Sequence, residues 1–204
     1  MRDLDIRAVL HARLASREAG KSNVRMVHEM CVLAGECRVD LAVINGRLEG
    51  FEIKSERDSL ERLPRQVEAY GKVFDRMTVV CAERHLEKVL ATVPAWWGVE
   101  AAKPRGDSVR IVRERAPKTN RALEPKAIAQ LLWRAETLQA LEELDAARGL
   151  RSKPRDVLWT ALAEALPERE LRRLVRERLR SREYWLSPDP QRTDDVWFPP
   201  LSKS

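Results

Sequence analysis

The sequence contains few of the residues that build disulfide frameworks or metal fingers. Its 204 residues include three cysteines and three histidines. An odd number of cysteines without a C-x-x-C pair argues against a disulfide framework. His28, Cys31 and Cys37 are close enough in sequence for a zinc site, but a fourth ligand is not evident. The simpler interpretation is that the cysteines are small buried hydrophobic residues.

Long apolar runs are also missing. No stretch approaches the roughly 20 apolar residues that a membrane-spanning helix needs. The first residues, MRDLDIRAVLHARL, alternate charged and apolar side chains and do not resemble the apolar centre of a signal peptide. We therefore expect a cytoplasmic protein that does not bind membranes.

The composition that is present indicates a folded, basic protein. Hydrophobic residues make up 44% of the chain, which is enough for a substantial core. Lysine and arginine outnumber aspartate and glutamate by 38 to 32, so the formal net charge is +6. Such a balance suits a polyanionic partner such as nucleic acid, although many soluble proteins share it.

The periodicity of apolar residues predicts an α/β fold for residues 1–116. The order of elements is αβββαβ with additions, which indicates a mixed sheet flanked by helices. We expect helices at about 3–17, 60–74 and 86–93, a hairpin within 38–55, and strands at about 24–31, 77–81 and 109–112.

Residues 117–204 form an all-helical region with a tail rich in proline and tryptophan. Helices are predicted at about 128–144, 155–166 and 168–184. The last one has an apolar side and an arginine side, which we interpret as a solvated face rather than a phosphate-binding face because glutamates are interspersed. These arginines are Arg172, Arg173, Arg176 and Arg180. A protein partner or a second copy of the chain could bind these helices, and we expect Tyr184, Trp185, Trp197 and Phe198 to hold the tail against the surface.

Three charged residues stand among the apolar residues of the predicted hairpin. Asp40 lies in its first strand, and Glu52 and Lys54 lie in its second. Burying an unpaired charge costs several kcal/mol, so these side chains need a partner or a metal. Two acids on neighbouring strands suit a hard cation, with Mg²⁺ as the first candidate, and Glu29 could add a third carboxylate. The alternative is a set of ordinary ion pairs, Glu52 with Lys54 or Asp40 with Arg38.

The geometry of the turn decides whether Asp40 and Glu52 can share a site. Opposed residues of an antiparallel hairpin lie on one face, and their numbers have a constant sum. A two-residue Asn45-Gly46 turn would place the two acids on opposite faces. We therefore predict a different connection. It is either a three-residue loop, in which the numbers of opposed residues add up to 90 or 92, or a hairpin with a bulge at Gly50.

The hairpin and the segment after it resemble the signature of the PD-(D/E)XK nuclease superfamily. Asp40 is followed, after eleven residues, by Glu52-Ile53-Lys54, and the next helix contains Gln66-x-x-x-Tyr70. The chain is also similar to a bacterial family of small nuclease-like proteins, in which counterparts of Glu29, of the EIKS stretch and of the run from Asp58 to Leu63 recur. Val39 stands where the superfamily name has proline, which carries no chemistry.

This resemblance implies a restriction-endonuclease-like core and a Mg²⁺-dependent nuclease that hydrolyses DNA, in repair or in defence against phages and mobile elements. Mn²⁺ could replace Mg²⁺. Asp40, Glu52 and the Ile53 carbonyl would bind the metal, Glu29 would assist directly or through water, and Lys54 would orient the attacking water. The nucleic-acid contacts would be Gln66, Tyr70, Arg57, Arg62 and Arg65. Tyr70 can equally be a core aromatic residue, and the rival functions are a non-catalytic nucleic-acid-binding module and a partner subunit on the same fold.

Overall fold

Six strands form one mixed sheet in the part of the chain that the computed structural model describes, residues 2–106, 108–182 and 185. The strands follow one another across the sheet in chain order. β3 pairs in parallel with β4, and β4 with β5, while the other neighbours are antiparallel. The strands are β1 (Arg25–Val32), β2 (Cys37–Ile44), β3 (Leu48–Lys54), β4 (Arg76–Ala82), β5 (Gly98–Arg105) and β6 (Ser108–Arg115).

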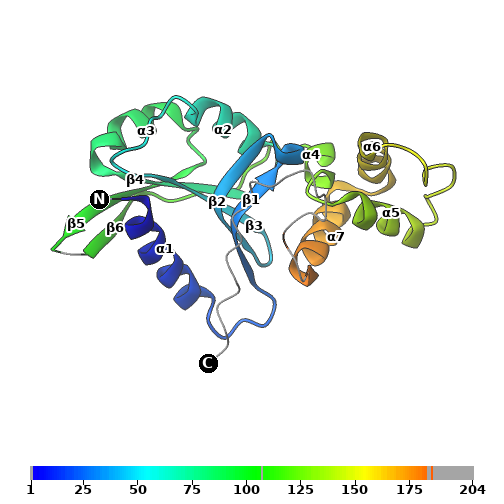
Figure 1. Cartoon of the computed structure of the whole chain (residues 1–204), viewed down its shortest axis with the longest axis horizontal. Coiled ribbons are helices and arrows are strands. Elements are labelled where there is room, and N and C mark those ends of the chain that lie inside the picture. The colour runs from blue at the N-terminus through cyan, green and yellow to red at the C-terminus, as the bar shows by residue number, and fades with distance from the viewer. Residues whose placement is uncertain (1, 107, 183–184, 186–204) are drawn as a thin grey trace.

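Helices cover both faces of this sheet (Figure 1). α1 (Asp3–Glu18) lies on one face, where its buried Ile6, Leu10 and Leu14 follow the spacing of a helical stripe. α2 (Leu63–Gly71) and α3 (Leu86–Thr92) lie on the other. The order α1-β1-β2-β3-α2-β4 confirms the α/β fold predicted from the sequence.

Two elements differ from the sequence prediction. β5 has no counterpart among the elements predicted from the sequence; its residues GVEAAKPR include few strand-favouring side chains and a proline. It becomes a strand because it lies beside the buried β4, where Ala101 and Ala102 are fully covered. The single helix expected at 128–144 is divided into α4 (Pro125–Ala129) and α5 (Arg134–Glu143). The division occurs at Trp133, whose backbone is extended and whose N–H donates to Glu136, starting a new helix.

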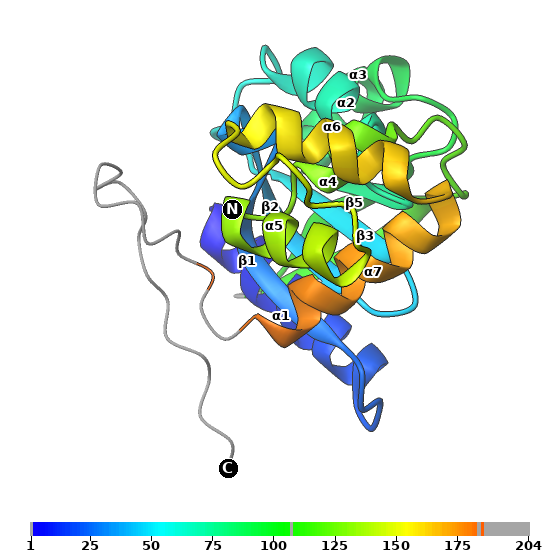
Figure 2. The ribbon, with the colours of Figure 1, turned by 90° about the vertical axis from the view of Figure 1, so that its right-hand side faces the viewer.

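The C-terminal helices α4, α5, α6 (Arg155–Ala165) and α7 (Glu168–Ser181) lie at one end of the sheet (Figures 1 and 2). The apolar residues Leu171, Val175 and Leu179 of α7 are buried in the same hydrophobic cluster as one face of the sheet. The proposed division of the chain at residues 116 and 117 stays a prediction.

The arginine side of α7 is not simply solvated, which corrects the sequence interpretation. Arg172 forms an ion pair with the buried Asp75, and Arg176 lies 3.7 Å from the same carboxylate. Arg180 donates to the carbonyl of Asn45 in the loop between β2 and β3. Local periodicity gave no sign of these contacts, because the partners are far apart in sequence. Of the tail residues, Tyr184, Trp197 and Phe198 lie outside the described residues, whereas Trp185 is half-buried.

Gly50 of β3 packs closely against two buried side chains of the core. A Cβ there would lie 2.3 Å from the Met77 sulfur and 3.0 Å from a ring carbon of Phe74, and both side chains are fully buried. We expect Gly50→Ala to lower the free energy of unfolding by about 1–3 kcal/mol, because the added methyl group overpacks the core. Urea denaturation measures this. Gly46→Ala is the matched control, since nothing lies within 4 Å of its Cβ position, and equal losses in the two variants would contradict the expectation.

Candidate active site

The connection between β2 and β3 is a three-residue loop, Asn45 to Arg47. Pairs run from Ile44 opposite Leu48 to Leu41 opposite Phe51, so the numbers of opposed residues add up to 92. This confirms the prediction that the Asn-Gly sequence does not form a plain two-residue turn, and it selects one of the two predicted registers. Continued by one pair beyond the printed ladder, this register brings Asp40 beside Glu52.

The two strands separate just where Asp40 lies. The backbone ladder reaches the pair Leu41 and Phe51, and beyond it the Ile53 N–H donates to the Asp40 carboxylate, at 2.6 Å. The register of β1 places Glu29 across from Asp40 on the other side. Glu29 has a φ of 53°, a left-handed conformation that costs a non-glycine residue about 1–2 kcal/mol. Glu29, Asp40 and Glu52 thus form a row of acids across three neighbouring strands.

Glu52 is buried and held by three side chains. Lys54 Nζ donates to its Oε1 at 2.8 Å and to Gln66 Oε1 at 2.9 Å. Gln66 Nε2 donates to the same Glu52 oxygen. The Tyr70 hydroxyl lies 3.0 Å from Glu52 Oε2 and 2.7 Å from the Arg38 carbonyl, and its single proton can serve one of them at a time. The structure therefore brings together the residues that the EIK and Gln-x-x-x-Tyr elements indicated.

Tyr70 is a core aromatic residue whose hydroxyl also reaches the candidate site. Its ring is fully buried, with an edge contact to Phe74 and a stacking contact to Trp97. Its hydroxyl nevertheless reaches the charged group of Glu52. Burial and then the Glu52 charge raise the pKa of Tyr70, so the phenol stays protonated.

Arg7 of α1 is the site residue that the sequence analysis missed. Its guanidinium lies 2.9 Å from Asp40 Oδ1, 2.8 Å from Glu29 Oε1 and 3.0 Å from Asp3 Oδ1. The predicted alternative pair of Asp40 with Arg38 is replaced by this contact, and Arg38 pairs with Glu29 instead, at 2.8 Å. The other alternative, the pair of Glu52 with Lys54, is present. Only the packing of α1 on the sheet brings Arg7 here, so the sequence held no local signal for it.

The environment of Asp40 disfavours its negative charge. Burial is the largest cause that raises the pKa of Asp40 to about 7, and the neighbouring Glu52 carboxylate adds to the shift. The Ile53 N–H and the Arg7 guanidinium act in the opposite direction. A carboxyl that is crowded by a second carboxyl is a group whose charge a bound cation would stabilise.

The three acids become more exposed from β3 toward β1. The exposed fraction of the side chain rises from 4% for Glu52 on β3 through 18% for Asp40 on β2 to 30% for Glu29 on β1. Arg38 of β2, the partner of Glu29, is 50% exposed. The three arginines predicted to bind phosphates, Arg57, Arg62 and Arg65, are all exposed. Burial raises the pKa of the Cys37 thiol, and the charge of Arg65 opposes this shift.

The acids are not arranged around a cation in this conformation. Among residues 2–106, 108–182 and 185, no group of three or more His, Cys, Asp or Glu side chains is placed to hold a metal ion. His28, Cys31 and Cys37, which were considered as a zinc site, therefore do not form such a group. The same is true of the row of acids, because Glu29 is engaged by Arg7 and Arg38.

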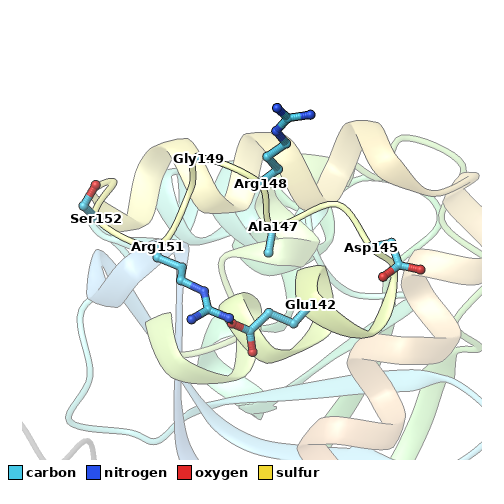
Figure 3. Close-up of a pocket in the computed structure, with 7 residues that line it drawn as sticks. All are labelled: Glu142, Asp145, Ala147, Arg148, Gly149, Arg151 and Ser152. Atoms are coloured by element: carbon cyan, nitrogen blue, oxygen red, sulfur yellow. The ribbon is translucent and has the colours of Figure 1, made fainter.

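A separate cavity of about 610 Å³ lies in the loop between α5 and α6 (Figure 3). The cavity is open to solvent and several of its lining residues are charged. Two of them, Arg151 and Glu142, form an ion pair at 2.9 Å. Arg148 points away from the other lining side chains. The lining residues are Glu142, Asp145, Ala147, Arg148, Gly149, Arg151 and Ser152, and they include none of the acids on the sheet.

In the described part of the chain, every helix is too short or too polar to cross a membrane.

Comparison with known proteins links the chain to a phage protein. Residues 2–188 match the family model described as bacteriophage P4 protein cII. Protein cII of Enterobacteria phage P4 is 38% identical over 89 residues, which are 44% of this chain and 34% of that protein. The aligned part thus spans about a third of the length of this curated relative.

Two solved structures match part of the chain. A protein of unknown function from Silicibacter pomeroyi is 23% identical, with 70% of this chain and 92% of that chain covered and a TM-score of 0.39. SfsA from Pyrococcus furiosus, solved in complex with Ca²⁺, is 14% identical, with 58% and 64% covered and a TM-score of 0.33. Such low scores carry no argument about function, and the resemblance to PD-(D/E)XK nucleases stays a prediction. The family model, in contrast, extends from α1 through α7, and the chain therefore belongs to the bacteriophage P4 protein cII family.

Proposed function

We propose that this chain is a Mg²⁺-dependent nuclease of the PD-(D/E)XK type that hydrolyses phosphodiester bonds of DNA. The observation that carries the proposal is the position of Asp40 beside Glu52 where β2 and β3 separate. Asp40 accepts the N–H of Ile53, the neighbour of Glu52, and the Lys54 ammonium lies 2.8 Å from Glu52. A purely structural hairpin has no need to place two acids across from each other in a buried position.

The oxygen donors of the acids are the type that a divalent cation prefers, while Glu29 is held by Arg7 and Arg38 in this conformation. The raised pKa of Asp40, caused by burial and by Glu52, indicates a local excess of negative charge that a cation would relieve. Asp40, Glu52 and the Ile53 carbonyl would hold Mg²⁺, with Glu29 as a further oxygen ligand once it leaves its arginine partners. When bound, Mg²⁺ would stabilise the charge that develops on the phosphate oxygens.

Lys54 has the chemistry to act on the attacking water. An ammonium has three N–H donors, and Glu52 and Gln66 accept two of them. The remaining donor can orient a water or hold a phosphate oxygen in the transition state. Gln66 fixes both Lys54 and Glu52, because its amide oxygen accepts from one and its amide nitrogen donates to the other.

The test of this proposal is a cleavage assay on single-stranded, nicked, branched and supercoiled DNA, and on RNA, with Mg²⁺, with Mn²⁺ and with chelator. We expect cleavage of DNA that requires the metal. Tight binding of DNA without cleavage in either metal would contradict nuclease activity and would identify the alternative, a non-catalytic nucleic-acid-binding module. Cleavage of RNA alone would contradict the assignment of DNA as the substrate.

Replacement of Lys54 by methionine is expected to slow cleavage by about 10²–10³-fold while Mn²⁺ still binds. Methionine keeps much of the side-chain length but removes the donor that acts on charge in the transition state. Single-turnover cleavage and Mn²⁺ titration measure the two effects. Lys88→Met on the exposed surface of α3 is the control. If Lys54→Met loses metal binding as strongly as cleavage, Lys54 is a structural partner of Glu52 instead.

A further inference from the structure

We propose that Arg7 is a built-in counter-ion that competes with the divalent cation for Asp40 and thereby sets the metal affinity of the site. The inference rests on the proposed function, because it concerns the same acids. It assigns a role to a residue of α1, which lies outside the hairpin and the helix that carry the nuclease-like motif.

The position of Arg7 is determined by the packing of α1. Ile6 and Leu10 on either side of it are fully buried against the sheet, which fixes this turn of the helix. Arg7 is itself mostly covered and reaches both the carboxylate and the carbonyl oxygen of Asp40, at 2.9 and 3.0 Å. Burial alone would lower the pKa of Arg7, but Asp40 and the other acids outweigh it and raise the pKa, so the guanidinium stays charged.

The oxygens of Asp40 are already engaged without a metal. Oδ1 accepts from Arg7 and Oδ2 accepts from the Ile53 N–H. A divalent cation at Asp40 would stand within a few ångströms of a fixed positive charge, and like charges at that distance repel strongly in a half-buried site. Metal binding must therefore displace the guanidinium or proceed with a lower affinity.

The surroundings of Arg7 make its displacement feasible. Its Nε is bound to Asp3 one helical turn earlier, so the guanidinium keeps an acidic partner after it leaves Asp40. Glu29 has a second partner in Arg38, so it also keeps a counter-charge. Because coupling between two ligands of one site is reciprocal, the metal weakens the hold on Arg7 by the same factor by which Arg7 weakens the metal.

The experiment compares Mn²⁺ binding to the full-length wild type and Arg7→Gln by electron paramagnetic resonance and calorimetry, without DNA. We expect Arg7→Gln to bind Mn²⁺ at least tenfold more tightly. Arg17→Gln is the matched control, because it removes an arginine of the same helix that pairs with Glu18 and Glu49, and its affinity should equal that of the wild type.

The outcomes separate this inference from the proposed function. Equal, measurable affinities of the wild type and Arg7→Gln would overturn the role of Arg7 and leave the metal site intact. Absence of Mn²⁺ binding in both proteins would overturn the metal site and the inference together. Should Arg7→Gln not fold, the resonances of the Arg7 Nη–H groups, which contact Asp40, are followed by NMR in the wild-type protein during a Mg²⁺ titration. A shift that saturates with the metal supports displacement, and unchanged resonances overturn it.

Discussion

Replacement of Glu52 by glutamine is expected to reduce DNA cleavage by about 10³-fold, equivalent to about 4 kcal/mol of transition-state stabilisation. The change removes the charge of a metal ligand but keeps the size of the side chain. The fold should tolerate it, because an amide oxygen can still accept from Lys54, and the Tyr70 hydroxyl can turn its proton to the Arg38 carbonyl. Single-turnover cleavage in Mg²⁺ and a circular dichroism spectrum measure the two parts of this expectation.

Glu49→Gln is the matched control for this variant. Glu49 lies on the same strand three residues earlier, is also buried, and pairs with Arg17 rather than with the candidate site. Its side chain is on the opposite face of the sheet, because the residue numbers differ by an odd value. Cleavage at the wild-type rate by Glu52→Gln, or an equal loss in Glu49→Gln, would show that the assignment of the active site is wrong.

Replacement of Asp75 by alanine is expected to lower the free energy of unfolding by about 3 kcal/mol. The Asp75 carboxylate is only 6% exposed, accepts the Leu48 N–H at 2.6 Å and pairs with Arg172 of α7. Its removal leaves a buried N–H without an acceptor and takes away the counter-charge of Arg172 and of the nearby Arg176. Urea denaturation of both proteins at the same pH measures the loss.

An exposed acid serves as the comparison for Asp75. Asp156 pairs with Lys126 at 2.8 Å, but both side chains are largely exposed, so Asp156→Ala should cost less than about 1 kcal/mol. The cleavage rate per folded molecule should be the same in both variants and the wild type, since Asp75 is separate from the acids of the site. An Asp75→Ala protein as stable as Asp156→Ala would mean that this ion pair does not attach α7 to the sheet.

Several features could be predicted from short stretches of sequence, because each depends on neighbours within a few residues. The spacing of Ile6, Leu10 and Leu14 indicated the buried side of α1, and the apolar run ending at Cys81 indicated β4. The register that brings Asp40 beside Glu52 followed from turn geometry, since the pairing of a hairpin depends on loop length. The αβββαβ order and the residues of the hairpin network were therefore determined by the sequence itself.

Other features were decided only by the tertiary structure. Arg7 and Asp40 are 33 positions apart in the sequence, and Arg172 and Asp75 are 97 positions apart, so no local pattern indicates either contact. β5 is a strand because β4 offers it a buried partner, although its own residues favour strands weakly. The sequence thus determined which charged groups the hairpin carries. The packing of α1 and α7 decided which counter-charges meet Asp40 and Asp75, because the free energy of a buried ion depends on groups that only the folded chain brings within hydrogen-bond distance.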